Sequence, residues 1–160
     1  MPSRGLSGGL AMFWSQGVFV AISSYSHHHI DAVIDPQEES SWRFTGFYGS
    51  PTVDGKRVAW DIFRTLRDHH HLPWLCTGDF NELLSREEKW GRLIRPEPQM
   101  LYFRQVVDEC GFVDLGFIGA SCTWWNRRDG AARVLERLDQ GLGFGFTISR
   151  LSSLIIGPFG

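Results

Sequence analysis

Short runs of alternating apolar and polar side chains fill the first third of the chain, a pattern typical of β-strands. We expect strands over residues 9–15, 18–25, 28–35 and 41–49. Residues 28–35 alternate strictly, as a half-buried strand does. Phe47 falls out of phase with Trp42 and Phe44 after Gly46, which predicts a β-bulge at that glycine. Successive strands of this kind indicate an antiparallel sheet.

The pattern then changes to the spacing of an amphipathic helix, carried by Val58, Ala59, Ile62, Phe63 and Leu66. Asp54 is the candidate N-cap of this helix. His69–His71 lie near its carboxyl end, where protonated imidazoles are favourable. Pro73 marks the stop.

A buried strand and a second helix follow. The segment "WLCTGDF", residues 74–80, is a nearly continuous apolar run typical of a strand that is buried on both faces. Residues 86–98 are charged and contain proline, so we expect a surface loop there. Pro98 suits the first turn of a helix and Gly111 its end. The apolar face of this helix consists of Met100, Phe103, Val106, Val107 and Cys110.

The last third carries weaker signals. "FVDLGF" and "CTWWNRR" are typical of short strands, residues 127–130 of a turn, and "VLERLDQGL" fits a strand or a helix. After Asp139 the sequence has no clean period. Taken in order, the elements predict one domain with a layered α+β sandwich.

Composition narrows the classes of function. The chain has 160 residues, 42% of them apolar, and a formal net charge of −2, so a polyanion would need a local basic patch. Cys76, Cys110 and Cys122 are odd in number and lack CxxC spacing, which fits neither a disulfide framework nor a zinc site. We therefore expect reduced thiols and an intracellular protein, with the nucleus as a candidate compartment.

The amino-terminal region has some features of a secretory signal. Arg4 precedes "GLAMFWSQGVFVAI", but Ser15–Gly17 interrupts the apolar run, and two strands joined by a tight turn explain it better. Export stays as the alternative. No apolar run approaches the roughly 20 residues that span a bilayer, so we expect no membrane partner.

Asp79 and Asn81 follow the buried strand directly, in "LPWLCTGDFN". Layered α/β proteins place sites at the carboxyl ends of buried strands. A carboxylate there can accept a proton from water or bind Mg²⁺, and a carboxamide can donate to a phosphoryl oxygen. The alternative is an Asx-turn that caps a helix formed by "NELL".

Two further groups of residues have a functional and a structural interpretation. Arg127, Arg128 and Arg133 flank Trp124–Trp125, and such a patch either grips DNA or forms a solvated hairpin tip. His27–His29 and His69–His71 are expected to be exposed and structural, with an adventitious metal site as the alternative.

Several motifs together resemble a known superfamily. In order they are "SGGLAMFW", "SYSHHHIDAVI", "WRFTGFYGSP", "LPWLCTGDFNELLSREEKWG", "PEPQMLYFRQVVDECGFVDLGF" and "TWWNRRDG…ERLD". They resemble the endonuclease/exonuclease/phosphatase superfamily, with its DNase I-like fold. Within it they are most similar to the endonuclease domain of plant LINE-type (non-LTR) retrotransposons and the host proteins derived from them. The resemblance covers about residues 6–142 and leaves 143–160 as a divergent tail.

The resemblance implies a four-layer α/β-sandwich, here incomplete, and Mg²⁺-dependent hydrolysis of phosphodiesters in DNA. It implies that Asp79 orients or deprotonates the attacking water and that Asn81 holds the scissile phosphate. Tyr48 would contact the phosphate or its leaving group, and Asp139 would orient a catalytic histidine. The bland alternatives are a surface hydroxyl for Tyr48 and, for Asp139, an ion pair with Arg137 or Arg133.

Two parts of the motif set are missing from this sequence. No segment supplies the strand with the metal-binding Glu upstream of Gly8, so the metal ligands are unassigned, and no His follows His71 to complete a Ser-Asp-His motif. We therefore expect a chain truncated at its start and altered at its end, with weak or no turnover. The alternatives are a non-catalytic nucleic-acid-binding or interaction remnant, and a translated retroelement fragment without a selected function.

Overall fold

The computed structural model describes residues 10–69 and 71–145. Its elements are β1 (Val20–Tyr25), β2 (His29–Ile34), β3 (Trp42–Tyr48), α1 (Val53–Arg67), β4 (Trp74–Asp79), the 3₁₀-helix η1 (Arg86–Glu88), β5 (Lys89–Trp90), α2 (Glu97–Glu109), β6 (Val113–Asp114), β7 (Trp124–Trp125), the 3₁₀-helix η2 (Gly130–Ala132), β8 (Leu135–Glu136) and β9 (Asp139–Phe144).

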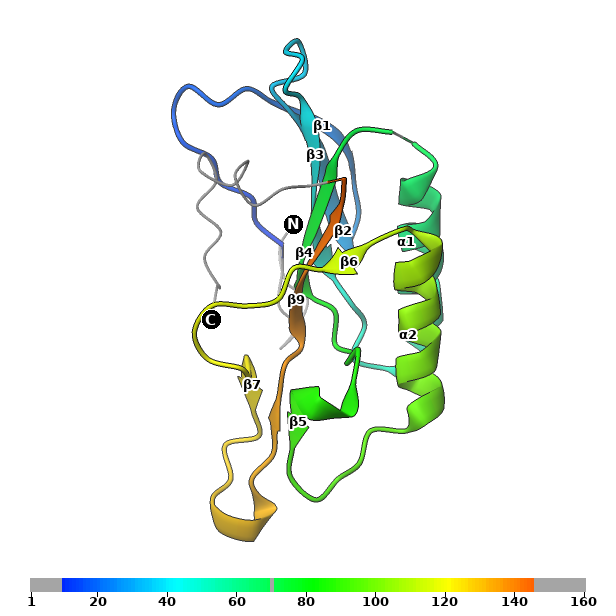
Figure 1. Ribbon diagram of the computed structural model, residues 1–160, viewed down its shortest axis with the longest axis vertical. Helices are drawn as coiled ribbons and strands as arrows, with labels where there is room; N and C mark the ends of the chain where they lie inside the picture. Colours follow the sequence, from blue (N-terminus) through cyan, green and yellow to red (C-terminus); the bar gives the residue numbers. More distant parts are fainter. Residues whose placement is uncertain (1–9, 70, 146–160) are drawn as a thin grey trace.

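A six-stranded sheet in the order β1-β2-β3-β4-β9-β6 forms the centre of the described part, and α1 and α2 cover one of its faces (Figure 1). The strands β1, β2 and β3 are antiparallel, as predicted, whereas the crossover through α1 makes β4 parallel to β3. A second sheet, β5-β8-β7, adjoins the end of the large sheet where β9 begins (Figure 1). This arrangement confirms the α+β class.

Both faces of β2 and β3 are buried, which corrects the half-buried strand expected over residues 28–35. Asp31 is fully buried on the helix-covered face. Phe47 packs toward the helices while Trp42 and Phe44 pack on the opposite face, because both sides of β3 carry a core. The side chains of β3 alternate regularly between the two faces, and this alternation places Phe47 on the face opposite to Trp42 and Phe44. The register of β2 and β3 runs unbroken through Gly46, so the predicted bulge is absent there, and the irregularity lies in β1 instead.

The core is divided between the two faces of the sheet. Aromatic rings dominate the larger, helix-side cluster, which includes Phe47, Trp60, Phe63, Trp74, Phe80, Phe103 and Phe112. The smaller cluster on the opposite face contains Ala32, Ile34, Trp42, Phe44 and Leu75. Met12 packs against this second cluster, and residues 10–15 form no strand, which corrects the first predicted element. Phe13 and Trp14 of this segment are exposed, so its apolar residues do not mark a buried strand.

Helix α1 begins at a different cap from the one predicted. Thr52 is the N-cap, and its hydroxyl accepts a hydrogen bond from Gly55 N at 3.3 Å, while Asp54 lies in the first turn. Val58 is exposed and Trp60 takes its place on the buried face, because the helix turns its aromatic side toward α2 and the sheet. No helix within residues 10–69 and 71–145 is long and apolar enough to cross a membrane.

The cysteines behave as expected from the sequence. Cys76 and Cys110 are buried free thiols, and Cys122 is a half-buried free thiol. Burial raises the pKa of Cys110 to about 11 and that of Cys76 well above its usual value, so both stay protonated at neutral pH.

The ambiguous segment "VLERLDQGL" forms parts of two strands, β8 and β9. Strand β9 lies between β4 and β6 although its sequence has no clear alternation. Gly141 and Gly143 occupy one face of β9 without side chains, which removes the apolar signal from that face. The expected domain limits, 6–142 and 143–160, stay a prediction, because residues 146–160 lie outside the described part.

Gly78 is required where β3 and β4 approach each other, one residue before Asp79. Its φ is +146°, and a Cβ at this position would lie 1.9 Å from Phe47 O. We expect Gly78→Ala to lower the free energy of unfolding by about 3 kcal/mol or more, measured by urea denaturation. Gly141→Ala is the matched control in β9, since a Cβ there meets no atom within 4 Å. Equal midpoints for the two variants would contradict this account.

Candidate functional site

Tyr48, Asp79 and Asp139 form one row across β3, β4 and β9. The strand register pairs Tyr48 with Asp79, and Asp79 with Asp139. Paired residues on neighbouring strands project from the same face of a sheet, and adjacent strands are about 4.8 Å apart. The row lies on the face opposite the helices, because Phe47, one residue before Tyr48, packs into the helix-side core. Three of the four predicted catalytic residues are therefore neighbours.

Asn81, the fourth, is held beside this row by a tight turn. Asn81 N donates to Asp79 Oδ1 at 2.8 Å, and the Asn81 Nδ2 donates to Gly49 O at 3.0 Å. The φ of Asn81 is 53°, a left-handed conformation that Asn tolerates better than most residues. The Asx-turn alternative is therefore present in the geometry, but residues 81–84 form no helix for it to cap. The turn fixes the Asn81 carboxamide against the segment that follows Tyr48.

The Asp79 carboxyl group is electrostatically unusual. Its pKa is raised from 3.8 to about 6, chiefly by burial and in part by the nearby Asp139 carboxylate, and hydrogen bonds from Asn81 oppose the shift. Asp139 itself is exposed. Two carboxylates that face each other across neighbouring strands repel one another when both are ionised, and a bound cation would relieve that repulsion.

The oxygen atoms at this position fit a hard cation. Asp79 Oδ1 accepts from Asn81 N, and the exposed Asp139 carboxylate is its pair on the neighbouring strand. Mg²⁺ is commonly held by one or two carboxylates and otherwise keeps waters or phosphate oxygens. No group of three or more His, Cys, Asp or Glu in the described residues could hold a metal ion on its own. The two carboxylates are donors of the kind that Mg²⁺ accepts, and the rest of its coordination shell would have to come from water or another ligand.

Asp139 is oriented by its backbone. Asp139 N and Leu138 N both donate to Thr123 Oγ1 at 3.1 Å. The ion pair proposed as the bland alternative is absent in the described residues, because Arg137 binds Glu88 and Asp114 instead. The exposed carboxylate of Asp139 is thus left on the row.

The predicted nucleic-acid contacts Trp124, Arg127 and Arg128 lie on the β7–β8 hairpin, the yellow and gold loop in Figure 1. All three side chains are exposed. The Arg133 guanidinium lies 5.7 Å from the centre of the Trp125 ring. The hairpin is connected to the row along the chain, because only two residues separate the end of β8 from Asp139 at the start of β9. Trp124, Arg127 and Arg128 therefore lie at the same end of the sheet as Asp79, but they are not members of the row.

The histidines differ from expectation. His29 is buried, its ring nitrogens bonded to Ser24 Oγ at 3.0 Å and Ser26 Oγ at 2.8 Å, and burial lowers its pKa. His27 is exposed and His28 is half-buried. His69 and His71 are exposed as expected, and His70 lies outside the described residues. The predicted exposed role is therefore wrong for His29, which faces the helix-side core.

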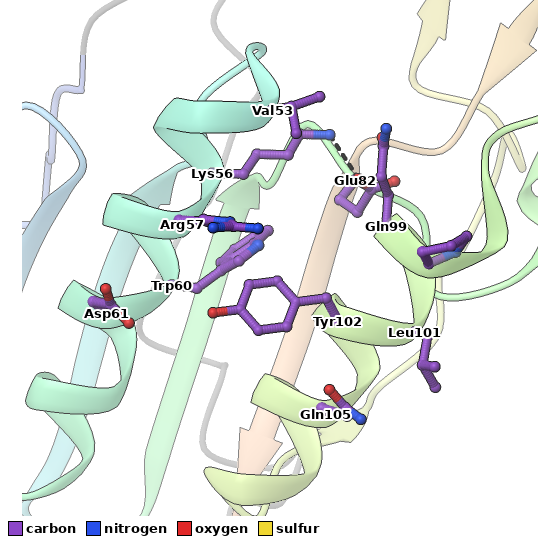
Figure 2. Close-up of a pocket in the computed structure, with 11 residues that line it drawn as sticks. Val53, Lys56, Arg57, Trp60, Asp61, Glu82, Gln99, Leu101, Tyr102 and Gln105 are labelled. Atoms are coloured by element: carbon purple, nitrogen blue, oxygen red, sulfur yellow. Dashed lines mark hydrogen bonds and ion pairs between the residues drawn. The ribbon is translucent and has the colours of Figure 1, made fainter.

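Sequence reasoning missed a buried ion pair next to Asn81. Lys56 Nζ lies 2.6 Å from Glu82 Oε2, and both side chains are almost completely buried. Figure 2 shows this pair at one end of a groove between α1 and α2, with Trp60 and Tyr102 along it. The groove encloses about 520 Å³ and is lined by Val53, Lys56, Arg57, Trp60, Asp61, Glu82, Pro98, Gln99, Leu101, Tyr102 and Gln105.

This groove lies between the two helices and contains none of the predicted site residues, so we assign the chemistry to the row and not to this groove. The Lys56–Glu82 pair links the first turn of α1 to the loop that carries Asn81. The sequence shows Glu82 only as one acidic residue after "GDFN", and nothing in that pattern indicates that Glu82 is buried or paired with Lys56.

Among comparisons with known proteins, only the comparison with solved structures gives a match. No family model matches the chain, and no curated protein matches it. Among solved structures, the chain is similar to the "Endonuclease domain of TRAS1, a telomere-specific non-LTR retrotransposon", with a TM-score of 0.61 and 15% sequence identity. The match covers 80% of this chain and 56% of that one, so the chain spans little more than half of that domain. The described part therefore has the α+β, DNase I-like endonuclease fold that the motifs predicted.

Proposed function

We propose that this chain binds phosphodiesters of DNA at the row of Tyr48, Asp79 and Asp139 and hydrolyses them slowly with Mg²⁺. The observation that carries the proposal is the register, which aligns three polar side chains on one sheet face with the Asn81 carboxamide beside them. The fold shared with a retrotransposon endonuclease domain supports nucleic acid as the substrate class.

Each residue has a role that follows from its contacts. The Asp79 carboxylate, held by Asn81 N through Oδ1, would orient a water, and a pKa of about 6 suits a base that works near neutral pH. Asn81 is fixed by its bond to Gly49 O, and its carboxamide would donate to a phosphate oxygen. Tyr48 would donate its hydroxyl to the phosphate. Asp139 would hold Mg²⁺, which when bound would supply positive charge to stabilise the negative charge that develops on the phosphate and leaving oxygens.

Slow turnover is part of the proposal. The resemblance places a metal-binding Glu and a histidine in the complete motif set, and neither is among the residues of the row. Groups that act as a unit contribute non-additively, so the row alone is expected to give a small fraction of full activity. The plant LINE origin and the nuclear location stay predictions.

A nicking assay tests the proposal. Purified chain is incubated with supercoiled plasmid in Mg²⁺, with a chelator control and with Asp79→Ala prepared in parallel to measure contaminating nuclease. We expect open-circle product above the level of the variant, and none with chelator. Nicking by wild type that equals nicking by Asp79→Ala would rule out hydrolysis at this row.

A second candidate function is DNA binding without hydrolysis, favoured by the exposed arginines and tryptophans of the β7–β8 hairpin. This function requires neither Asp79 nor Mg²⁺. It is the conclusion to draw if the chain binds duplex DNA but does not nick it.

The hairpin arginines are expected to contribute to DNA affinity through phosphate contacts. Each lost phosphate contact should reduce the slope of log K against log salt by about 1, so Arg127→Ala/Arg128→Ala should lower it by about 2. Fluorescence anisotropy with a labelled duplex at several salt concentrations measures this slope. Arg67→Ala is the control, because Arg67 lies at the end of the sheet opposite to Asp79. Arg67 is the last residue of α1, and the preceding residue, Leu66, accepts a hydrogen bond from Arg43, which pairs with the first residue of β4. An unchanged slope in the double variant would exclude the hairpin as a contact.

A further inference from the structure

The turn that carries Asn81 is attached at three points to the segment that leads from β3 into α1. Gly49 N donates to Asp79 O at 2.7 Å, and Asn81 Nδ2 donates to Gly49 O at 3.0 Å. The third point is an ion pair, in which Lys56 Nζ lies 2.6 Å from Glu82 Oε2. The attachments thus lie before, at and after Asn81 along the chain.

The ion pair is buried, and both oxygens of the Glu82 carboxylate have partners. The side chains of Lys56 and Glu82 are only 6% and 1% exposed. Glu82 Oε2 binds Lys56, whereas Glu82 Oε1 accepts from Leu83 N at 3.0 Å and lies 3.5 Å from Arg95 Nε. Moving either member away would leave an uncompensated charge in the interior. The pair therefore fixes the distance between α1 and the residue that follows Asn81.

The backbone conformation of Asn81 requires support from its surroundings. Its φ of 53° lies in the left-handed region, where a residue other than glycine persists because neighbouring contacts hold it. The first turn of α1 is a firm base for such a contact, since a Cβ at Gly55 would lie 2.1 Å from Ser50 Oγ. Figure 2 shows the Lys56 side chain extending from α1 to Glu82. The ion pair thus joins a closely packed helix start to the residue next to Asn81.

We propose that Lys56 and Glu82 are positioning residues of the candidate site, whose ion pair holds the Asn81 carboxamide in the orientation that binds a phosphate oxygen. The inference rests on the proposed function, since it takes Asn81 as a phosphate contact. Both side chains of the pair are almost completely buried, so they act through Asn81 and not by touching DNA. Tyr48 and Asp79 do not depend on the pair in the same way, because strand pairing fixes their register.

Two double variants provide a matched comparison. Lys56→Met/Glu82→Gln removes both charges with little change in volume, so no unpaired ion remains in the interior. Asp31→Asn/Arg43→Met removes another buried ion pair, whose members lie 2.8 Å apart and are both completely buried. Arg43 pairs with the first residue of β4, at the end of that strand away from the turn. The control therefore makes the same kind of change in the core without touching the attachments of Asn81.

The direct test measures by NMR how fast the side-chain NH₂ of Asn81 exchanges hydrogen with water, in the full chain without DNA or metal. The signal is assigned by its absence in Asn81→Ala. We expect Lys56→Met/Glu82→Gln to raise the rate about 10-fold, the weight of one hydrogen bond, and Asp31→Asn/Arg43→Met to leave it unchanged. An unchanged rate in the first variant overturns the proposal, as does an equal rise in both. If the first variant does not unfold cooperatively in urea, Glu82→Gln takes its place in this comparison.

A double-mutant cycle on DNA affinity separates positioning from general structural support. Fluorescence anisotropy with a labelled duplex, recorded without metal, gives the Kd of each variant. Lys56→Met/Glu82→Gln should weaken binding about 10-fold when Asn81 is present, and no further in the Asn81→Ala background, because the carboxamide that the pair positions is then gone. No loss when Asn81 is present, or equal fold losses in both backgrounds, overturns the proposal. If wild type binds no DNA, the proposed function fails, and the exchange rate of Asn81 alone decides the role of the pair.

Discussion

Replacing Asp79 with Asn is expected to abolish Mg²⁺-dependent nicking and to raise the free energy of unfolding at pH 8. The amide is nearly isosteric and its Oδ1 can still accept from Asn81 N, so the turn survives. It cannot accept a proton from water, and loss of a carboxylate from a catalytic unit typically costs about 10⁴-fold in rate. Initial rates of plasmid nicking in Mg²⁺ measure this loss.

The gain in stability follows from the direction of the pKa shift of Asp79. The folded pKa of about 6 lies above the ordinary value of 3.8, so between these pH values the folded chain keeps a proton that the unfolded chain has lost. Stability of the wild type therefore falls as pH rises through this window and stays lower above it. A shift of this size corresponds to roughly 3 kcal/mol. Partial exposure of the carboxyl group reduces the expected gain of Asp79→Asn at pH 8 to about 1–2 kcal/mol.

Urea unfolding of both proteins at pH 4 and pH 8 distinguishes this effect from a general change in packing. The advantage of Asp79→Asn should be small at pH 4 and complete at pH 8. Adding Mg²⁺ should raise the melting temperature of wild type more than that of the variant, because the ion offsets the carboxylate repulsion. Asp129→Asn, at the exposed hairpin tip, controls for removal of one negative charge. A stability gain independent of pH would show that the Asp79 carboxylate is not the cause.

The elements that could be predicted from the sequence are those with one buried face and a strong period. Helices α1 and α2 carry such faces, and "WLCTGDF" has the apolar run of a buried central strand, so all three were recognised. Strand β9 was missed because Gly141 and Gly143 leave one face without side chains. Residues 10–15 were predicted as a strand because apolar composition alone does not show whether a segment has a neighbouring strand to pair with.

The candidate site was predictable as a set of residues but not as a geometry. The motifs identified Tyr48, Asp79, Asn81 and Asp139, and the register aligns three of them. The burial of His29 was not predicted because it depends on the pairing of β2 with β3, which no local pattern specifies. The burial of the Lys56–Glu82 pair likewise depends on two segments that meet only in the fold.

Asp31 and Arg43 form a closed polar network inside the helix-side core. Both side chains are fully buried, with Arg43 Nε 2.8 Å from Asp31 Oδ1 and Nη2 3.1 Å from Asp31 Oδ2. Arg43 Nη1 also donates to Leu66 O at 2.6 Å and so ties the end of α1 to the sheet. The Arg43 guanidinium lies 4.2 Å from the centre of the Trp74 ring, and Thr45 Oγ1 donates to Asp31 at 2.5 Å.

Arg43→Met is therefore expected to be among the most destabilising single substitutions in the chain. It leaves the Asp31 carboxylate buried without its cation, which typically costs about 3–5 kcal/mol. The free energy of unfolding of a whole domain is only about 5–15 kcal/mol. Urea denaturation at pH 7 measures the loss. The double variant Asp31→Leu/Arg43→Met should recover much of it, because replacing both members of a buried pair by apolar groups avoids the unpaired charge. If the two single losses simply added in the double variant, Asp31 and Arg43 would not be energetically coupled, and α1 would be held to the sheet by its aromatic face alone.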